Sequence, residues 1–366
     1  MLETIIAVLI ISSIAALLAG LLVFCESYIS NYGPCDISIN SGEKEMTVQG
    51  GGSLLSALVD NKIFISSACG GRGTCGYCKV KVLQGGGPVL PTETPFLTVD
   101  EIKNNTRLSC QVKIRGPMRL EVPQEMLAVR QFSATCIDIL DLTYDIKQFR
   151  FKLDTPAEMS FVAGQYIQLV CPKYERSDEE VQRAYSIASN PAEKGQIELI
   201  IRLVPEGICT TWCFNHLKIG DPVKLNGPFG KFRLSNTDVP MILIAGGSGM
   251  APIKSILHLM KNINSQRQAF YFFGARTPRD VFLVDSLQQF EQDLPNFEFI
   301  PVVGDPAGTQ WNGEVGLVTE VVQRRFESLP EAEGYLCGSP GMINASIKAL
   351  TQLGIQEEKI YYDSFA

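Results

Sequence analysis

A glycine-rich segment with three closely spaced cysteines constrains the fold of this chain more than any other feature. Cys69, Cys75 and Cys78 form a C-x5-C-x2-C run, and thirty-one residues separate Cys78 from Cys110. A 2Fe-2S cluster needs four cysteine sulfurs, and three ligands from one loop require a backbone that folds tightly around the inorganic core. Glycine adopts positive φ at little cost and lets backbone N–H groups approach the sulfurs. The glycines of the run are Gly70, Gly71, Gly73 and Gly76. The segment therefore predicts a 2Fe-2S cluster held by the four cysteines.

Zinc and disulfides are the alternative uses of these cysteines. Zinc knuckles usually contain two C-x2-C pairs, and eleven cysteines in 366 residues are too dilute for a disulfide scaffold. The loop has one residue more than the plant-type C-x4-C-x2-C spacing, which does not prevent ligation. The other cysteines have no ligand spacing and are expected to be small buried apolar residues, with Cys25 buried or interfacial. They are Cys35, Cys136, Cys171, Cys209 and Cys213.

An uncharged segment of twenty-one residues runs from Thr4 to Phe24. As a helix it would be about 31 Å long at roughly 1.5 Å per residue, which matches the hydrocarbon thickness of a bilayer. A cleaved signal peptide is the alternative, but it would begin with basic residues, whereas this chain begins Met1-Leu2-Glu3. We therefore expect a single transmembrane helix that is retained as an anchor. Glu26 follows it without nearby Lys or Arg, so the positive-inside rule gives no orientation.

Composition limits the remaining classes of protein. At 366 residues the chain exceeds one ordinary domain and is long enough for two or three. Hydrophobic residues make up 45% and charged residues 19%, which describes folded domains rather than a disordered chain. The net charge of -7 argues against nucleic-acid binding, which needs an excess of Lys and Arg. His216 and His258 are the two histidines, so a His-rich metal site or a Ser-His-Asp hydrolase is not expected.

Hydrophobic patterns divide the chain into an anchor, residues 1–30, and three soluble modules. Residues 31–126 carry apolar stretches among glycine clusters, as in a small mixed sheet with a helix. Residues 127–237 contain alternating runs separated by Gly and Pro, which indicate an antiparallel barrel. In residues 238–366, an apolar strand, a glycine turn, a helical stretch and a second strand from Ala269 to Phe273 make a βαβ unit, which predicts a doubly wound parallel sheet. The expected fold class is thus multidomain, α+β and α/β.

The middle module contains two groups of residues suited to a flavin. Arg183-Ala184-Tyr185-Ser186, placed at the start of a strand, offers a cation, a flat aromatic ring and a hydroxyl to one cofactor. Gly207, Thr210 and Thr211 precede a helical run from Thr211 to Leu217, and hydroxyls at a helix N-terminus suit a pyrophosphate. A surface Arg183 and a core Tyr185 are the alternative interpretation. Gly227-Pro228-Phe229-Gly230 predicts a tight turn that closes the barrel.

The last module has two glycine turns that follow apolar strands. Gly246-Gly247-Ser248-Gly249-Met250-Ala251-Pro252 lies between a strand and a helix, as a phosphate-binding turn should, although it lacks the full G-x-G-x-x-G pattern. Cys337-Gly338-Ser339-Pro340-Gly341-Met342 also caps a strand, which places a thiol at the carboxyl end of the sheet, where ligands bind. We expect a nicotinamide there. A turn needed only for packing and a buried strand-end thiol are the alternatives.

The order of these motifs resembles that of the ferredoxin-linked members of the ferredoxin-NADP reductase superfamily. It is more closely similar to the F subunits of the sodium-translocating NADH:quinone oxidoreductases, over nearly the whole chain and including the N-terminal span. The stretch from Arg202 to Thr211 departs from the pattern by being shorter. Three further segments carry the resemblance: Gly85-Gly86-Gly87 to Leu90-Pro91-Thr92-Glu93, Phe273-Gly274-Ala275-Arg276 and Asp363-Ser364-Phe365-Ala366.

The resemblance implies a transmembrane helix, a β-grasp ferredoxin domain, a flavin-binding barrel and a doubly wound nucleotide-binding domain. NADH would pass a hydride to FAD, and the cluster would take the electrons singly towards a membrane acceptor, without a protein acid-base pair. Ser186, Cys337 and Phe365 would be catalytic, with Phe365 covering the flavin ring until it swings aside. The implied ligands of the cluster are Cys69, Cys75, Cys78 and Cys110. The implied FAD-binding residues are Arg183, Tyr185, Ser186, Gly207, Thr210, Thr211 and Phe365. The implied NADH-binding residues are Gly246, Gly247, Gly249, Cys337 and Gly338.

By the same resemblance, the chain would sit in a bacterial inner membrane with its soluble domains in the cytoplasm. Its partners would be membrane subunits of a respiratory complex that reduces quinone, with sodium transport as a coupled process. A reductase component that feeds a membrane monooxygenase is the alternative enzyme, and an electron carrier with vestigial nucleotide folds is the non-enzymatic one. We expect NADH rather than NADPH, although Arg276 and Arg279 lie where a 2'-phosphate could be met.

Overall fold

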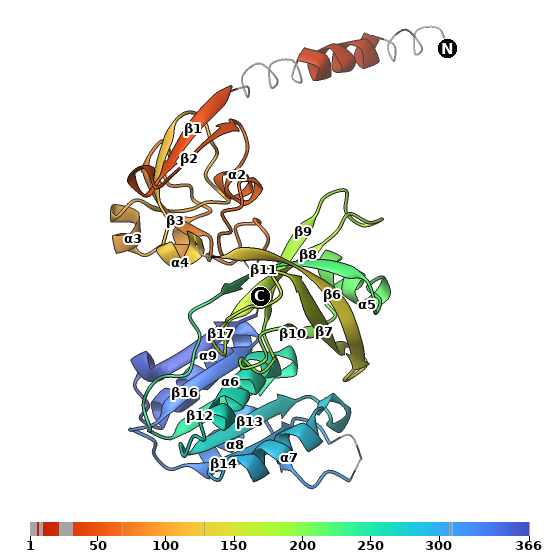
Figure 1. Ribbon diagram of the computed structural model, residues 1–366, viewed down its shortest axis with the longest axis vertical. Helices are drawn as coiled ribbons and strands as arrows, with labels where there is room; N and C mark the ends of the chain where they lie inside the picture. The colour runs from red at the N-terminus through yellow and green to blue at the C-terminus, as the bar shows by residue number, and fades with distance from the viewer. Residues whose placement is uncertain are drawn as a thin grey trace. The chain divides into compact units, whose positions relative to one another are not determined.

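The computed structural model describes residues 6, 10–21, 32–67, 69–127, 129–306, 308 and 310–365 (Figure 1). The chain forms two compact units. The first comprises Met1–Ser66 and Gly71–Ala128, and the second comprises Ser67–Gly70 and Val129–Ala366. The expected barrel and nucleotide-binding modules therefore belong to one unit.

The N-terminal helix covers residues 10–21 of the described chain. Its large apolar side chains are exposed, and Leu17 reaches 74%. Much of the rest of the expected span lies outside the described residues, including Thr4 and Phe24. Within the described part of the chain, no helix combines the length and the apolar character needed to cross a bilayer.

A mixed five-stranded sheet forms the centre of the first unit. Its elements are β1 (Pro34–Ile39), η1 (Asn40–Gly42), β2 (Lys44–Gln49), α2 (Leu54–Asp60), β3 (Lys79–Gln84), η2 (Thr94–Phe96), α3 (Val99–Lys103), β4 (Thr106–Leu108), β5 (Met118–Glu121) and α4 (Gln124–Leu127). The strand order is β2-β1-β5-β3-β4, in which only β1 and β5 pair in parallel. Alternate residues of β1 face the core, because successive side chains of a strand point to opposite faces. Ser53 caps α2 by accepting the N–H of Ser56, and the helix packs its leucines on that core. The predicted mixed sheet with a helix is confirmed.

An antiparallel barrel forms the first part of the second unit. Its elements are β6 (Arg130–Asp141), β7 (Ile146–Thr155), β8 (Tyr166–Cys171), β9 (Val181–Ser186), β10 (Gln196–Arg202), α5 (Ile208–Asn215) and β11 (Pro222–Phe229). The order is β10-β7-β6-β11-β8-β9, with every neighbouring pair antiparallel. A bridge between Ile187, which follows β9, and Leu199 of β10 joins the two edge strands. The predicted barrel is therefore confirmed.

A parallel six-stranded sheet forms the rest of the second unit. Its elements are β12 (Met241–Gly246), η3 (Gly247–Gly249), α6 (Met250–Asn262), β13 (Ala269–Ala275), η4 (Pro278–Asp280), α7 (Val284–Asp293), β14 (Phe297–Val303), β15 (Glu314–Val315), α8 (Val318–Arg325), β16 (Glu333–Gly338), α9 (Pro340–Gln352), η5 (Glu357–Lys359) and β17 (Ile360–Ser364). The order is β15-β14-β13-β12-β16-β17, and all pairs are parallel.

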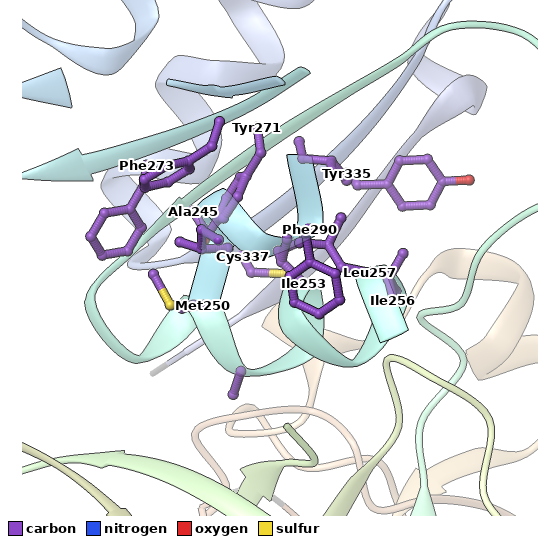
Figure 2. Packing of buried hydrophobic residues seen from close by; sticks show 14 of the residues in the cluster. Ala245, Met250, Ile253, Ile256, Leu257, Tyr271, Phe273, Phe290, Tyr335 and Cys337 are labelled. Carbon is purple, nitrogen blue, oxygen red and sulfur yellow. The ribbon is translucent and has the colours of Figure 1, made fainter. Parts of the chain in front are cut away.

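Helices cover both faces of this parallel sheet. Leu243 and Ala245 of β12 pack with α6 and α7, as part of Figure 2 shows, whereas Ile242 and Ile244 pack with α8 and α9. A strand buried on both faces reads as a continuous apolar run, which is why Met241 to Ala245 lacks alternation. The predicted doubly wound sheet is confirmed.

Three local predictions in the barrel were wrong. Residues 183–186 end β9 rather than begin a strand, because pairing with β8 already starts at Val181. Helix α5 begins at Ile208 instead of Thr211, since Gly207 occupies the N-cap position. Residues 227–229 belong to β11 rather than to a turn. Pro228 has no N–H to donate, so the pairing with β8 is irregular there and resumes at Phe229.

A buried ion pair connects β16 with the segment between α6 and β13. Arg267 donates to Glu333 Oε2 at 2.7 Å, and the two side chains are 2% and 4% exposed. The hydroxyls of Ser235, Thr237 and Tyr335 donate to the same carboxylate. Burial opposes the ionisation of Glu333, but these hydrogen bonds outweigh it and hold its pKa below the usual value. The network therefore contributes stability above the usual glutamate pKa, and that contribution is lost as the pH falls through the lowered pKa.

Replacing Glu333 with Gln should lower the free energy of unfolding of the second unit by about 3–5 kcal/mol, because Arg267 would stay buried without its counter-charge. Denaturant unfolding followed by fluorescence measures this loss. Glu314→Gln is the matched control, since its partner Arg324 is 56% exposed and the loss should stay below about 1 kcal/mol. Equal losses for the two variants would contradict the importance of the buried pair.

Candidate functional site

Two of the predicted cluster ligands lie side by side in the first unit. The sulfurs of Cys78 and Cys110 are 3.3 Å apart, and the N–H of Ser109 donates to the C=O of Cys78 at 2.8 Å. The hydrogen bond between the thiols and burial raise the pKa of Cys78, so iron would have to displace a proton there. In the described ranges of the chain, no set of three or more metal-binding side chains is gathered. Cys69 and Cys75 are half-buried.

The glycine run has the backbone that the cluster prediction requires. Gly70, Gly71, Gly73 and Gly76 have φ values of +66°, +88°, +75° and +72°. Residues with a Cβ rarely adopt this region, so the glycines let the chain reverse direction within the loop. A side chain on Gly76 would also lie 2.9 Å from the ring of Phe96. A loop of this shape with half-exposed thiols suits an Fe-S cluster.

Residues 67–70, which include Cys69, pack within the second unit. Gln168 of β8 donates its Nε2–H to the C=O of Ser67 at 2.9 Å, and both residues are buried. A side chain on Gly70 would overlap the guanidinium of Arg183. The segment with the first predicted ligand therefore contacts β8 and β9.

Strand β9 carries three of the predicted flavin ligands, Arg183, Tyr185 and Ser186. Arg183 is half-buried and donates to the C=O of Gln182 at 2.8 Å. The ring of Tyr185 packs on the barrel core, and burial raises the pKa of its hydroxyl well above the usual value. Ser186 is 7% exposed at the end of the strand. An aromatic ring and a cation on one strand suit the ring and the phosphates of FAD.

Asp363 of β17 is a candidate residue that sequence reasoning missed. It accepts a hydrogen bond from Ser186 Oγ at 3.0 Å, across 177 positions of sequence. Burial raises the pKa of Asp363 to about 6, although the hydrogen bond from Ser186 lowers it. Nothing in the spacing of an isolated aspartate indicates such a contact. The only available signal was its place two residues before Phe365.

The parallel register places Cys337 beside Asp363. Ala245 of β12 pairs with Cys337 of β16, which pairs with Asp363 of β17. Cys337 is fully buried among the side chains in Figure 2, and burial, followed by the charge of Asp363, raises its pKa well above the usual value. The thiol therefore stays protonated at neutral pH. Phe365 follows β17 and donates its N–H to the C=O of Gly338 at 2.9 Å.

The glycine turn after β12 lies against the carboxyl end of β16, where Cys337 is found. Gly246 ends the strand, and Gly247 has a φ of +55°. A side chain on Gly249 would overlap the C=O of Cys337, so only glycine lets α6 begin so close to β16. An open turn at the start of a thirteen-residue helix fits a dinucleotide phosphate.

The hydroxyls of Thr210 and Thr211, which were predicted to bind a pyrophosphate, make hydrogen bonds within the protein instead. Because α5 begins at Ile208, Thr210 and Thr211 lie in its first turn. The Thr210 hydroxyl is buried and bonds with Val204 backbone atoms, which closes the loop before the helix. Thr211 Oγ1 accepts from Arg176 at 3.2 Å. Gly207 cannot be replaced freely, since a side chain there would lie 2.6 Å from Thr210 Oγ1.

Comparison with known families identifies three domains in the expected order. The 2Fe-2S iron-sulfur cluster binding domain matches residues 37–115. The oxidoreductase FAD-binding domain matches residues 133–234, and the oxidoreductase NAD-binding domain matches residues 243–348. The predicted cofactors, a 2Fe-2S cluster, FAD and NADH, are confirmed at the level of these domains.

Curated relatives and solved structures match most of the chain. The F subunit of the Na(+)-translocating NADH-quinone reductase of Neisseria meningitidis is 36% identical over 404 residues, with 99% of each chain covered. Its counterpart from Actinobacillus succinogenes is 35% identical, with 97% covered. The cytochrome P450 reductase GcoB of Amycolatopsis has a TM-score of 0.72 and 27% identity, covering 90% of this chain and 98% of its own. The ferredoxin reductase in carbazole 1,9a-dioxygenase has a TM-score of 0.69 and 26% identity, covering 91% and 99%. The chain therefore belongs to the family of the F subunits of Na(+)-translocating NADH-quinone reductases.

Proposed function

We propose that this chain oxidises NADH and delivers the electrons to a membrane respiratory complex that reduces quinone. The hydrogen bond between Ser186 and Asp363 carries this proposal, because it joins the flavin strand β9 to the nicotinamide edge of the parallel sheet. When bound, FAD accepts two electrons from NADH and the 2Fe-2S cluster carries them one at a time. Family membership supports quinone as the final acceptor, and sodium transport is part of the name of the relatives.

The roles that we propose for the site residues are those implied by the family resemblance. Arg183 would neutralise the FAD pyrophosphate, Tyr185 would line the ring, and Ser186 would hydrogen-bond the reacting flavin nitrogen. Phe365 would cover the ring until nicotinamide binds. Gly207, Thr210 and Thr211 would shape the FAD loop. The residues that would hold the other groups are Cys69, Cys75, Cys78 and Cys110 for the cluster and Gly246, Gly247, Gly249, Cys337 and Gly338 for NADH.

Asp363 adds a proton acceptor to this site, and this part of the proposal replaces the expectation that no protein acid-base pair takes part. Its pKa of about 6 leaves the carboxylate mostly ionised at neutral pH, with Ser186 Oγ donating to it. Removing two electrons from a hydride leaves one proton, so a base within reach of the reacting nitrogen assists each turnover. Ser186 Oγ would pass that proton to Asp363 Oδ2.

Asp363→Asn should lower kcat with NADH and ferricyanide by about tenfold or more, because the amide cannot take the proton. The wild-type kcat should fall as the pH drops through about 6, where Asp363 becomes protonated, whereas the variant should lack this step. Steady-state rates between pH 5 and pH 8, at equal flavin content, measure both effects. Asp285→Asn on the exposed face of α7 is the control. A variant with the wild-type pH profile would remove Asp363 from the proton path.

Cys75→Ser should abolish the EPR signal of the reduced cluster while FAD stays bound, because the two groups belong to different domains. Flavin absorbance and iron content measure the two cofactors separately. Cys35→Ser is the matched control, since Cys35 lies in the core of the same unit and outside the run. Loss of flavin from Cys75→Ser would show instead that the domains depend on each other for folding.

We further propose that residues 1–30 anchor the chain in a bacterial inner membrane, with the other domains in the cytoplasm. The uncharged run from Thr4 to Phe24 and the exposed apolar side chains of residues 10–21 support this. NADH is a cytoplasmic substrate, which sets the orientation. Membrane subunits that reduce quinone would be the partners.

Deleting residues 1–26 should leave NADH:ferricyanide activity unchanged and abolish quinone reduction in reconstituted membranes. The predicted ligands all follow Cys35, whereas a tether raises the effective concentration of the partner to roughly millimolar. A chain with Thr4 to Phe24 replaced by an unrelated single-span helix is the control and should restore quinone reduction. If the protein that lacks residues 1–26 reduces quinone fully at stoichiometric amounts, the segment only targets the chain to the membrane and does not support electron transfer.

A reductase component for an oxygenase is the second candidate function. It is favoured by the likeness to GcoB, a cytochrome P450 reductase, and to a dioxygenase ferredoxin reductase. Quinone reduction by the anchored chain with its membrane partners would favour the respiratory function, and its absence would favour the oxygenase reductase. We propose NADH as the preferred nucleotide in both. Of the two arginines that could meet a 2'-phosphate, Arg279 makes a cation–π contact with Tyr144, with its guanidinium carbon 4.5 Å from the ring centroid.

A further inference from the structure

The side-chain amide of Gln111 contacts a predicted cluster ligand. Gln111 Nε2 donates to the sulfur of Cys110 at 3.6 Å. On its other side, Gln111 Oε1 accepts a hydrogen bond from the hydroxyl of Thr92 at 2.9 Å. All three residues belong to the first unit. The amide thus bridges the Leu90-Pro91-Thr92-Glu93 segment and the fourth cysteine.

The chemistry of an iron-bound thiolate fixes which end of the amide faces the sulfur. A thiolate sulfur carries no hydrogen and can only accept, so the NH₂ group of Gln111 must point to Cys110. The carbonyl oxygen is then left for a donor, and the Thr92 hydroxyl supplies one. Thr92 therefore holds the amide in the orientation that donates to the ligand.

A buried ion pair holds Thr92 in place. Its neighbour Glu93 is fully buried and accepts from Arg107, at 2.6 Å for the shortest contact. The same carboxylate accepts the N–H groups of Leu90 and Leu108, both at 2.9 Å. Arg107 also donates to three carbonyl groups, those of Gly86, Gly87 and Pro88. This network ties the Thr92 segment to β4, which ends two residues before Cys110.

A glycine of the cysteine run provides space for the amide. Gly73 has a φ of +75°, and a side chain there would lie 2.5 Å from Gln111 Nε2. The loop that carries Cys75 and Cys78 thus leaves room for Gln111 at Cys110. The absence of a side chain at Gly73 therefore allows both the positive φ of the turn and the position of the Gln111 amide.

We propose that Gln111, oriented by Thr92, raises the reduction potential of the 2Fe-2S cluster by donating a hydrogen bond to the sulfur of Cys110. Reduction adds one electron, supplied by the reduced flavin, and no proton. The added negative charge lies partly on the sulfurs, so an N–H donor stabilises the reduced form more than the oxidised form. Gln111 would thereby favour electron transfer from FAD to the cluster. The inference rests on the proposed function in one respect, which is that Cys110 ligates iron.

Gln111→Leu in the full chain with both cofactors tests this proposal. Loss of the donor should lower the equilibrium constant for adding an electron to the cluster about tenfold, which is about 59 mV for a one-electron couple. Thr92→Val should shift the potential in the same direction by less, and Thr92→Ser should keep the wild-type value. EPR-monitored titration with dithionite gives the cluster potential, while flavin absorbance gives the FAD potential, which should not move.

Gln84→Leu is the matched control, because Gln84 is exposed on β3 of the same unit, and its cluster potential should equal that of the wild type. An unchanged potential in Gln111→Leu would overturn the proposal. If that variant binds no iron, Thr92→Val decides, and an unchanged potential there would also overturn it. Cys110→Ser tests whether Cys110 ligates the cluster, independently of the role of Gln111. A wild-type EPR signal in Cys110→Ser would refute ligation by Cys110, whereas a lost or altered signal leaves the potential of Gln111→Leu to decide on Gln111 alone.

Discussion

The register between β12, β16 and β17 is the constraint on which the candidate site depends. Parallel strands paired in register bring Ala245, Cys337 and Asp363 to one level of the sheet, although more than a hundred residues separate the first from the last. The same register brings Gly249 against the carbonyl of Cys337 and sets the start of α6. Ser186 then meets Asp363 from the barrel. A shift of one residue in β17 would turn Asp363 to the opposite face and break this contact.

Local patterns predicted most of the architecture, and long-range contacts account for what they missed. The apolar run before Gly246 and the alternation in the barrel predicted strands, because burial on two faces or on one face fixes which residues are apolar. The positive φ values in the cysteine run followed from glycine alone. In contrast, the start of α5 at Ile208 depends on Gly207 acting as a cap, and a glycine that follows Pro205 and Glu206 also fits a turn that ends further along the chain. Asp363 was missed because its partner Ser186 lies in another segment, which spacing within a segment cannot reveal. Gln111 directly follows Cys110, but its amide also accepts a hydrogen bond from Thr92, 19 positions away, and that contact gives no local signal.

Buried charges in this protein serve as connectors between segments rather than as reactive groups. The carboxylates of Glu93 and Glu333 each satisfy an arginine and several further donors. Such networks are costly to desolvate, so each depends on having all of its partners in place. Asp363 differs from both, because it has no cationic partner among its hydrogen bonds and its pKa rises to about 6 instead of falling. Burial of a carboxylate without a counter-charge thus brings its pKa towards neutral pH, which is why Asp363 is the proposed proton acceptor.

The 177 positions between Ser186 and Asp363 also set an order of events during synthesis. Domains fold as units from the N-terminus while the chain is being made, at about 5–20 residues per second. The first unit can therefore fold while β17 is still inside the ribosome, because all of its residues precede Val129. Asp363 can reach Ser186 only after β16 has joined the sheet and β17 has been released beside it. A nascent chain therefore lacks the hydrogen bond between the barrel and the parallel sheet until that last strand is added.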